Sequence, residues 1–228
     1  VKDYGFMFRE EPAPWKERAE RVSALAMDVT EVLTKFGYAP TRPAPWLPGM
    51  RIIDSPNFDE RPPGTVIDTV ILHYISLPPE HFSGDAVARL FTNSLDASAH
   101  PGFAGLEGLR VSSHFFLRRH GGLVQFVPPE KRAWHAGVSR LLDRERCNDF
   151  SIGIELEGSS HRPFTDTQYR RLQQLLARLF AAWPIRYIAG HSDVAPGRKE
   201  DPGPYFEWPR LQSVLDAHGV VRPFGDAP

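Results

Sequence analysis

Two histidines and one stiff loop carry the residue types that a metal-assisted hydrolase needs. His73 and His191 each follow an apolar run, and residues 190–204 add Asp201 among glycines and prolines. Strand ends and rigid loops are the places where a scaffold holds side chains out into a cleft. A catalytic zinc takes three ligands from His, Asp or Glu and keeps a position for water. His73, His191 and Asp201 therefore form a candidate zinc site.

Other interpretations of these residues remain open at this level. His100, His114 and His135 are further candidate ligands, and counting histidines does not choose among them. A single buried histidine is more often a hydrogen-bonded structural residue than a ligand. Residues 190–204 are also compatible with an ordinary solvated surface loop. Only the fold can bring the distant candidates together.

Glu155 is the best candidate for a general base. It lies in an apolar strand pattern over residues 151–156, where burial would raise the pKa of its carboxyl group toward a useful value. Glu157 shares the same strand face and is the obvious alternative. Lys199 could stabilise an oxyanion beside the metal, although most loop lysines are simply solvated.

A second polar set is suited to an anionic ligand. Arg110, Arg144 and Arg146 offer the forked guanidinium groups that contact carboxylates at two points. Trp134 offers a flat surface for a sugar ring, and a place in the core is its equally reasonable alternative.

The elements that must position these residues alternate between strands and helices. Gly121 and Gly122 indicate a hairpin, and Thr165 with Gln168 forms a capping box that starts a helix ending before Pro184. The predicted strands cover 66–72, 114–118, 123–127, 151–156 and 186–189, and the other predicted helices cover 85–93 and 207–218. This order predicts an α/β fold with a mixed central β-sheet flanked by helices.

The first residues are predicted to be separate from this fold. Residues 15–36 have the periodicity of an amphipathic helix, and residues 39–49 contain four prolines and form a stiff linker. We therefore expect a helical extension with its linker over 1–44, one domain over 45–220 and a tail over 221–228.

Composition excludes several classes of protein and site. The 228 residues include 27 Lys and Arg against 28 Asp and Glu, so the basic excess of a nucleic-acid-coating protein is missing. Cys147 is the single cysteine, which excludes internal disulfides and zinc sites with several thiolates. No apolar run is long enough for a transmembrane helix. With no export signal visible, a cytoplasmic location is expected.

A string of motifs resembles the AmpD family of 1,6-anhydro-N-acetylmuramyl-L-alanine amidases, within the wider zinc amidase group. The motifs occur in order along the chain, at residues 72–79, 99–101, 109–114, 131–138, 144–158 and 190–204. The resemblance implies a zinc amidase fold and hydrolysis of the amide between (anhydro-)N-acetylmuramic acid and L-alanine in peptidoglycan recycling. It also implies a small-molecule substrate, no nucleic-acid or membrane partner, and a monomer.

The resemblance assigns roles residue by residue. His73, His191 and Asp201 would hold Zn²⁺, Glu155 would position and deprotonate the attacking water, and Lys199 would stabilise the oxyanion. His114 and His135 then drop out as ligands, and Glu157 drops out as the base.

The same resemblance implies the substrate contacts. Arg110 and Arg146 would bind peptide carboxylates, Trp134 the sugar, and Ala195 the peptide backbone. Tyr74 stands where close relatives often have Asn, which bears on the sugar preference. Two other functions compete with this one: a non-catalytic peptidoglycan-binding module, and an exported amidase acting on intact cell wall.

The first 36 residues lie outside the match. They weakly resemble a segment of glycolate oxidase iron–sulfur subunits, without the cysteines that a cluster would need.

Overall fold

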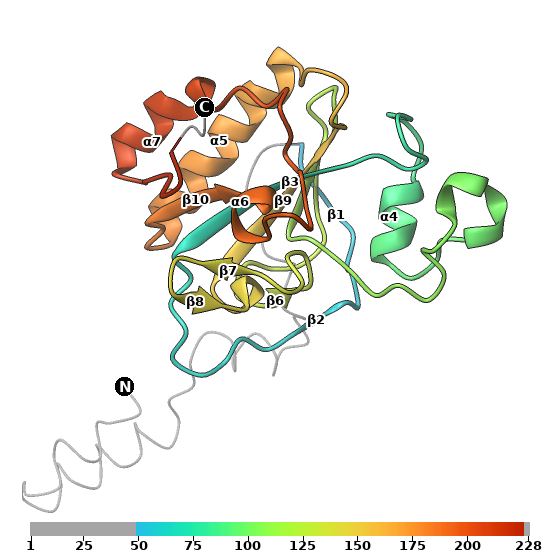
Figure 1. Ribbon diagram of the computed structural model, residues 1–228, viewed down its shortest axis with the longest axis horizontal. Helices are drawn as coiled ribbons and strands as arrows, with labels where there is room; N and C mark the ends of the chain where they lie inside the picture. Colours follow the sequence, from blue (N-terminus) through green and yellow to red (C-terminus); the bar gives the residue numbers. More distant parts are fainter. Residues whose placement is uncertain (1–48, 226–228) are drawn as a thin grey trace, which may run out of the picture. The chain divides into compact units, whose positions relative to one another are not determined.

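The computed structural model describes residues 49–225, and a six-stranded mixed sheet forms their centre (Figure 1). The strand order is β1-β5-β4-β9-β3-β10. The sheet comprises β1 (Arg51–Ile52), β3 (Thr69–Ile75), β4 (Phe115–Leu117), β5 (Leu123–Gln125), β9 (Ser151–Glu157) and β10 (Tyr187–Gly190). Only β4 and β5 pair antiparallel, as the hairpin predicted around Gly121 and Gly122, and the other pairs are parallel. The predicted α/β class with a mixed sheet is confirmed.

The central pair of strands sets the register on which the site depends. β3 and β9 run parallel, with Thr69 opposite Ser151 and His73 opposite Glu155. The sequence pattern placed His73 just past a strand end, and this was wrong. The strand continues through Tyr74 and Ile75 because β9 offers Leu156 and Glu157 as ladder partners beside them.

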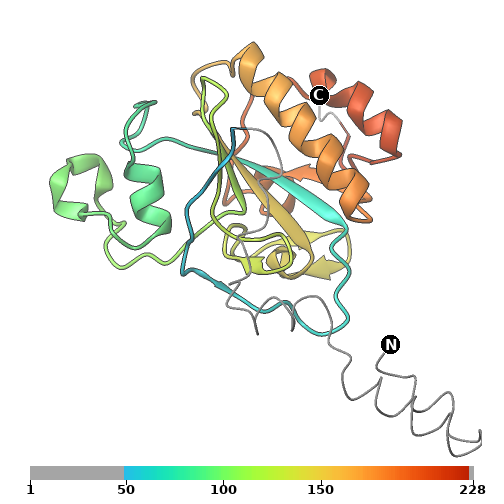
Figure 2. The ribbon, with the colours of Figure 1, turned by 180° about the vertical axis from the view of Figure 1, so that it is seen from behind.

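Helices α5 (Asp166–Ala182) and α7 (Gln212–His218) lie together on one side of the sheet (Figures 1 and 2). The predicted capping box at Thr165 and Gln168 is present and starts α5. The apolar stripe of α5 packs on the sheet in one buried cluster, which includes Ile152, Ile154, Leu156, Leu172, Leu176 and Leu179. Each buried leucine contributes about 1.5–3 kcal/mol, so this layer holds β9 firmly in place. The predicted last helix begins as the 3₁₀ turn η4 (Trp208–Leu211) and continues as α7.

The alternate residues of β9, among them Gly153 and Glu155, lie on the opposite face from α5. On that side are the one-turn helix α6 (His191–Val194), the 3₁₀ turn η3 (Cys147–Asp149) and two small antiparallel ribbons. The ribbons are β2 (Phe58–Asp59) with β6 (Arg132–Ala133), and β7 (Arg140–Leu141) with β8 (Arg144–Glu145).

A separate lobe lies to the side of the sheet away from α7 (Figures 1 and 2). It contains α4 (Ala86–Phe91), which confirms the helix predicted over 85–93, and the 3₁₀ turns η1 (Ala97–Ala99) and η2 (Pro101–Phe103). Val87, Leu90 and Phe91 join a second apolar cluster with Phe116 and Phe126 of the hairpin.

Some predictions fall outside residues 49–225. The helix over 15–36 and the extension over 1–44 lie outside the described residues, and the division into 1–44, 45–220 and 221–228 stays a prediction. At the other end, the described part of the tail adds to the sheet, since Val221 accepts a hydrogen bond from the Ile188 amide. Across the described residues, no helix has both the length and the apolar character to cross a membrane.

Candidate metal centre and active site

His73, His191 and Asp201 come together in the folded chain, with one ligand atom of each facing the others. Nδ1 of His73 lies 2.9 Å from Nδ1 of His191 and 2.9 Å from Oδ2 of Asp201. Nδ1 of His191 lies 3.1 Å from the same oxygen. All three residues are buried. Among residues 49–225, they form a group of the kind that can hold a metal ion.

Different elements deliver these three side chains. His73 comes from β3, whereas His191 follows β10 and opens α6. Residues 190–204 were expected to form neither helix nor strand, and this was wrong for the first turn. Oδ2 of Asp193 accepts a hydrogen bond of 2.7 Å from the Gly190 amide, which stabilises the start of that turn. The Ser192 amide donates to the carbonyl of Asp201 at 2.8 Å and so returns the loop to the site.

The hydrogen bonds around His191 show which of its nitrogens is free for a metal. Nε2 of His191 lies 3.1 Å from the carbonyl oxygen of Ala136, and a carbonyl oxygen only accepts. The neutral imidazole therefore carries its proton on Nε2. Its Nδ1 then presents a lone pair toward the Asp201 carboxylate, which is also an acceptor.

Nδ1 of His73 likewise faces the other two ligands, and its Nε2 contacts a side chain instead of a backbone carbonyl. Its Nε2 lies 3.0 Å from Nδ1 of His135, on the edge of the ring opposite the Asp201 carboxylate. Burial lowers the pKa of His73 to about 4, so its imidazole is neutral at pH 7.

The donor set fits a zinc ion. Two neutral imidazoles and one carboxylate are typical zinc ligands, and bonds of ~2.0–2.1 Å in a tetrahedron place ligand atoms roughly 3.3 Å apart. The observed spacings of 2.9–3.1 Å require only a small outward shift. Three acceptors this close repel one another unless a cation lies between them.

Glu155 and Glu157 lie on one strand face but have opposite surroundings. Glu155 is 8% exposed, and within residues 49–225 its buried Oε2 has no hydrogen-bond partner. Burial, followed by the Asp201 charge, raises the pKa of Glu155 well above its ordinary value, while Lys199 acts in the opposite direction. Glu157 instead accepts hydrogen bonds from the Arg119 amide at 3.0 Å and from the Arg118 guanidinium at 3.4 Å. The free carboxylate beside the metal group is therefore Glu155.

The competing histidines are engaged elsewhere. His114 is fully buried, where its Nδ1 accepts from the Gly153 amide and its Nε2 faces the carbonyl of Lys131. Nδ1 of His100 accepts from the Gly102 amide in an exposed turn. His135 contacts His73 on the side away from the other two ligands.

A cavity of about 290 Å³ opens over the metal group. Besides His73, His191 and Asp201, its wall includes Glu155, Lys199, Trp134, Tyr74 and His135. Lys199 is exposed at this cavity, whereas Trp134 and Tyr74 are partly buried. The hydroxyl of Tyr74 donates to Oε1 of Glu200 at 2.5 Å, which ties β3 to the loop that carries Asp201.

The remaining predicted contacts lie at a second hollow and on the surface. Arg146 and Ala195 line a hollow of about 500 Å³ together with Arg198. The side chain of Arg146 is 67% exposed and pairs with Asp149 at 3.1 Å, and Arg110 is exposed. Arg144 has a structural role, because it pairs with Asp68 at 3.0 Å and stacks on Phe150.

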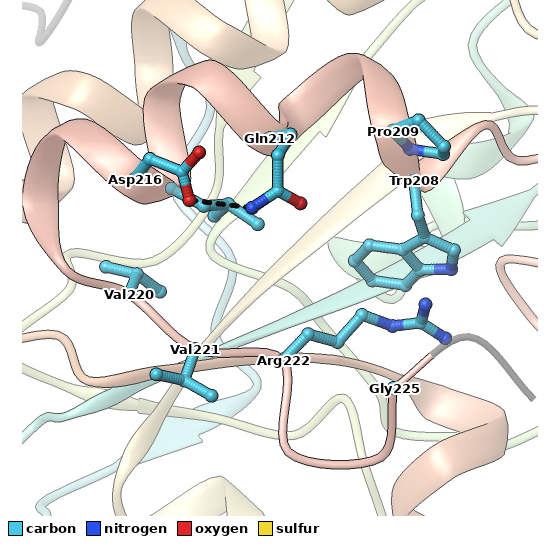
Figure 3. A pocket seen from close by; sticks show the side chains of 9 residues that line it. Trp208, Pro209, Gln212, Asp216, Val220, Val221, Arg222 and Gly225 are labelled. Atoms are coloured by element: carbon cyan, nitrogen blue, oxygen red, sulfur yellow. Dashed lines mark hydrogen bonds between the residues drawn. The ribbon is translucent and has the colours of Figure 1, made fainter.

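A larger hollow of about 520 Å³ lies between η4, α7 and residues 220–225 (Figure 3). In it, the indole of Trp208 faces the guanidinium of Arg222, and Gln212 donates to Asp216 on the opposite wall. No histidine lines this hollow, and Asp216 is its one carboxylate. The residue types suited to hydrolytic chemistry therefore line the smaller cavity at the candidate metal group.

Two arginines behind the site had no signal in the sequence. Arg198 donates to the carbonyls of Ala136 at 2.7 Å and Val138 at 2.6 Å, so it holds the same carbonyl that orients His191. Arg61 donates to the backbone carbonyls of Pro129, Asn148, Asp149 and Ser151, and its Nη2 also lies 3.2 Å from Nε2 of His114. Burial lowers the pKa of Arg61 to about 10. Both act through backbone atoms, which no residue pattern specifies.

The sequence is similar to known amidases. The sequence matches the family described as N-acetylmuramoyl-L-alanine amidase (Amidase_2) over residues 63–204. It is 49% identical over 172 residues to the 1,6-anhydro-N-acetylmuramyl-L-alanine amidase AmpD of Escherichia coli K12, covering 75% of this chain and 94% of that protein. It is 49% identical over 168 residues to AmpD of Haemophilus influenzae, covering 72% and 91%.

Solved structures give the same result. A crystal structure of a selenomethionine AmpD derivative superposes with a TM-score of 0.71 at 47% identity, covering 74% of this chain and 96% of that one. The solution structure of Citrobacter freundii AmpD has a TM-score of 0.56 at 45% identity, covering 82% and 98%.

Proposed function

The chain belongs to the N-acetylmuramoyl-L-alanine amidase family, and from this membership we propose its substrate and its cofactor. It hydrolyses the amide bond between (1,6-anhydro-)N-acetylmuramic acid and the L-alanine of the stem peptide, in peptidoglycan recycling, and it depends on zinc. The observation that carries the proposal is the convergence of three buried ligand atoms beside a buried carboxylate, Glu155.

His73, His191 and Asp201 would hold the zinc ion through Nδ1, Nδ1 and Oδ2. When bound, zinc supplies a Lewis acid that polarises the substrate carbonyl and lowers the pKa of water. Both imidazoles present lone pairs, and the carboxylate supplies negative charge that lessens the net charge of the loaded site.

Glu155 acts as general base and then as general acid. It takes a proton from the attacking water and returns it to the alanine nitrogen as the amide bond breaks. Three features support this role: its position opposite His73 in the sheet, its burial, and a carboxylate oxygen without another hydrogen-bond partner in the described chain. The raised pKa of Glu155 makes it a stronger base than an exposed carboxylate.

Lys199 stabilises the negative charge that develops on the carbonyl oxygen. It is exposed at the cavity over the metal group, and its charge acts on the pKa values of both Glu155 and His73. A cation that influences both groups is close enough to favour charge developing between them.

The substrate contacts divide between the two hollows. Trp134 and Tyr74 line the cavity over the metal group and would contact the sugar, Tyr74 through its ring because its hydroxyl is bonded to Glu200. Arg146 and Ala195 line the second hollow and would contact the stem peptide. Exposed Arg110 would bind a peptide carboxylate. We propose in addition that the substrate is a small molecule and that the enzyme is a cytoplasmic monomer.

Mass spectrometry of the reaction products tests this proposal. The chain is incubated with anhydromuropeptide or with polymeric peptidoglycan, each with and without a chelator. We expect anhydromuropeptide to be split into the anhydro sugar and the free peptide, the polymer to react more slowly, and the chelator to stop both reactions. Intact anhydromuropeptide with zinc-loaded protein would contradict the proposal. Faster cleavage of the polymer would instead support an amidase that acts on intact cell wall.

A further inference from the structure

Nε2 of His73 contacts a second imidazole, whereas Nε2 of His191 contacts a backbone carbonyl. Nδ1 of His135 lies 3.0 Å from Nε2 of His73, and the rings meet edge to face at 81° with their centroids 5.1 Å apart. This contact is on the ring edge opposite Nδ1 of His73, the atom that faces His191 and Asp201.

A chain of hydrogen bonds fixes the direction of this contact. Oγ of Ser151 lies 2.5 Å from the carbonyl oxygen of Cys147, so the serine hydroxyl donates to it. The same Oγ lies 3.3 Å from Nε2 of His135 and can only accept there. Neutral His135 therefore carries its proton on Nε2 and a lone pair on Nδ1. That lone pair accepts the Nε2 proton of His73.

The position of the His135 ring is itself fixed. It lies over Gly153 of β9, where an added Cβ would come within 2.4–2.7 Å of three ring atoms. Real Cβ contacts are never that short, so a side chain at residue 153 would displace the imidazole. The backbone of His135 is held as well, because Oδ1 of Asn148 accepts from the amides of His135 at 3.2 Å and Ala136 at 2.8 Å.

We propose that His135 is a positioning residue for the metal centre. By accepting the Nε2 proton of His73, it holds the tautomer and ring orientation in which Nδ1 is available as a ligand. The inference rests on the proposed zinc site and adds to it a residue that is not itself a metal ligand. Ligand histidines whose second nitrogen is engaged in this way bind metal more tightly, by about 10- to 100-fold.

Two variants of His135 separate positioning from packing. His135→Leu keeps an apolar side chain of similar bulk over Gly153 but offers no acceptor. His135→Asn is smaller, yet its Oδ1 is bonded to Cγ as Nδ1 is in histidine, so it can accept the same proton. A packing role predicts that Leu is tolerated better than Asn, and a positioning role predicts the reverse order.

The measurement is the zinc dissociation constant of the full chain, by competition with a chromophoric chelator. We expect His135→Leu to bind zinc about 10- to 100-fold more weakly than wild type and His135→Asn to recover most of that loss. Circular dichroism in chelator shows whether each variant is folded. Nitrogen-15 NMR of the histidines in chelator gives a second readout, with the His73 proton on Nε2 in wild type and in the Asn variant, and a larger fraction of Nδ1-protonated His73 in the Leu variant.

Wild-type affinity in His135→Leu, or a greater loss in His135→Asn than in His135→Leu, would overturn the inference. Because the assay needs no turnover, it also separates this inference from the proposed function. A chain that binds zinc with the expected order of affinities but leaves anhydromuropeptide intact would contradict only the function.

Discussion

On one side of the candidate metal centre, His73 and Glu155 lie opposite each other on neighbouring strands, in a register fixed by backbone hydrogen bonds. On the other side, His191 and Asp201 come from a loop that single contacts hold in place, such as the Asp193 cap on the Gly190 amide. The strand side is rigid because the α5 layer covers the sheet from behind. The loop side depends on individual hydrogen bonds, so single substitutions should displace its ligands more easily.

Loss of a ligand from either side gives the largest expected effect. His73→Ala and Asp201→Ala should each lose bound zinc and at least about 10³-fold of any hydrolytic rate, because two ligands hold the ion poorly. Elemental analysis and the anhydromuropeptide assay measure both quantities.

The same two variants should differ when zinc is absent. His73→Ala leaves a cavity in a fully packed strand and should lower the free energy of unfolding by about 2–4 kcal/mol in chelator. Asp201→Ala should cost much less, since it removes one of three mutually repelling acceptors. Equal losses in chemical denaturation would show that the two sides do not differ in rigidity.

Arg198→Leu tests the loop side through the backbone carbonyl that contacts His191. It removes the donor that holds the carbonyl of Ala136 against His191, and we expect zinc affinity to fall about 10-fold. Exposed Arg178 on α5 provides the matched control, because Arg178→Leu makes the same change of charge on a different element. If the two variants bind zinc equally well, the carbonyl contact does not tune the site.

Glu157→Gln tests the strand side without touching the metal. One carboxylate oxygen becomes an amide that faces the donors of Arg118 and Arg119. We expect a loss of about 1–3 kcal/mol in the free energy of unfolding, with zinc content and turnover nearly unchanged. A large loss of turnover with stability intact would transfer the catalytic role from Glu155 to Glu157.

Tyr74→Phe should give the smallest effect. It removes one exposed hydrogen bond, to Glu200, that joins β3 to the Asp201 loop. We expect at most about 1 kcal/mol in stability and less than a threefold change in zinc affinity. A larger fall in zinc affinity would mean that the strand holds the loop, and the two sides would then act as one unit.

The sequence was informative where a local pattern determines the structure. The capping box at Thr165 and Gln168, the Gly121–Gly122 hairpin and the apolar strand bearing Glu155 all follow from such patterns, and all are present. The two-residue strands β1, β2, β6, β7 and β8 were not predicted, because their partners and not their own residues define them.

The site was predictable only in part, for the same reason. The proximity of His73, His191 and Asp201 was expected, whereas the position of His73 inside β3 depends on how far β9 continues beside it. The packing of the His135 ring over Gly153 could not be predicted, because the two residues lie in different segments and no sequence spacing relates them. The hydrogen bond from Arg198 to the carbonyl of Ala136 could not be predicted either, because its acceptor is a backbone atom that any residue type would supply. The roles of the site residues remain predictions.

A paired measurement on Glu155→Gln tests the proposed catalytic role of this carboxylate beside the zinc site. Zinc content and anhydromuropeptide turnover are determined for this variant and for wild type in the same preparation. We expect one zinc per chain in both proteins and a loss of about 10²- to 10⁴-fold in turnover for the variant, because the amide cannot accept the proton of water. Turnover at the wild-type rate in zinc-loaded Glu155→Gln would contradict the role of Glu155 as the general base.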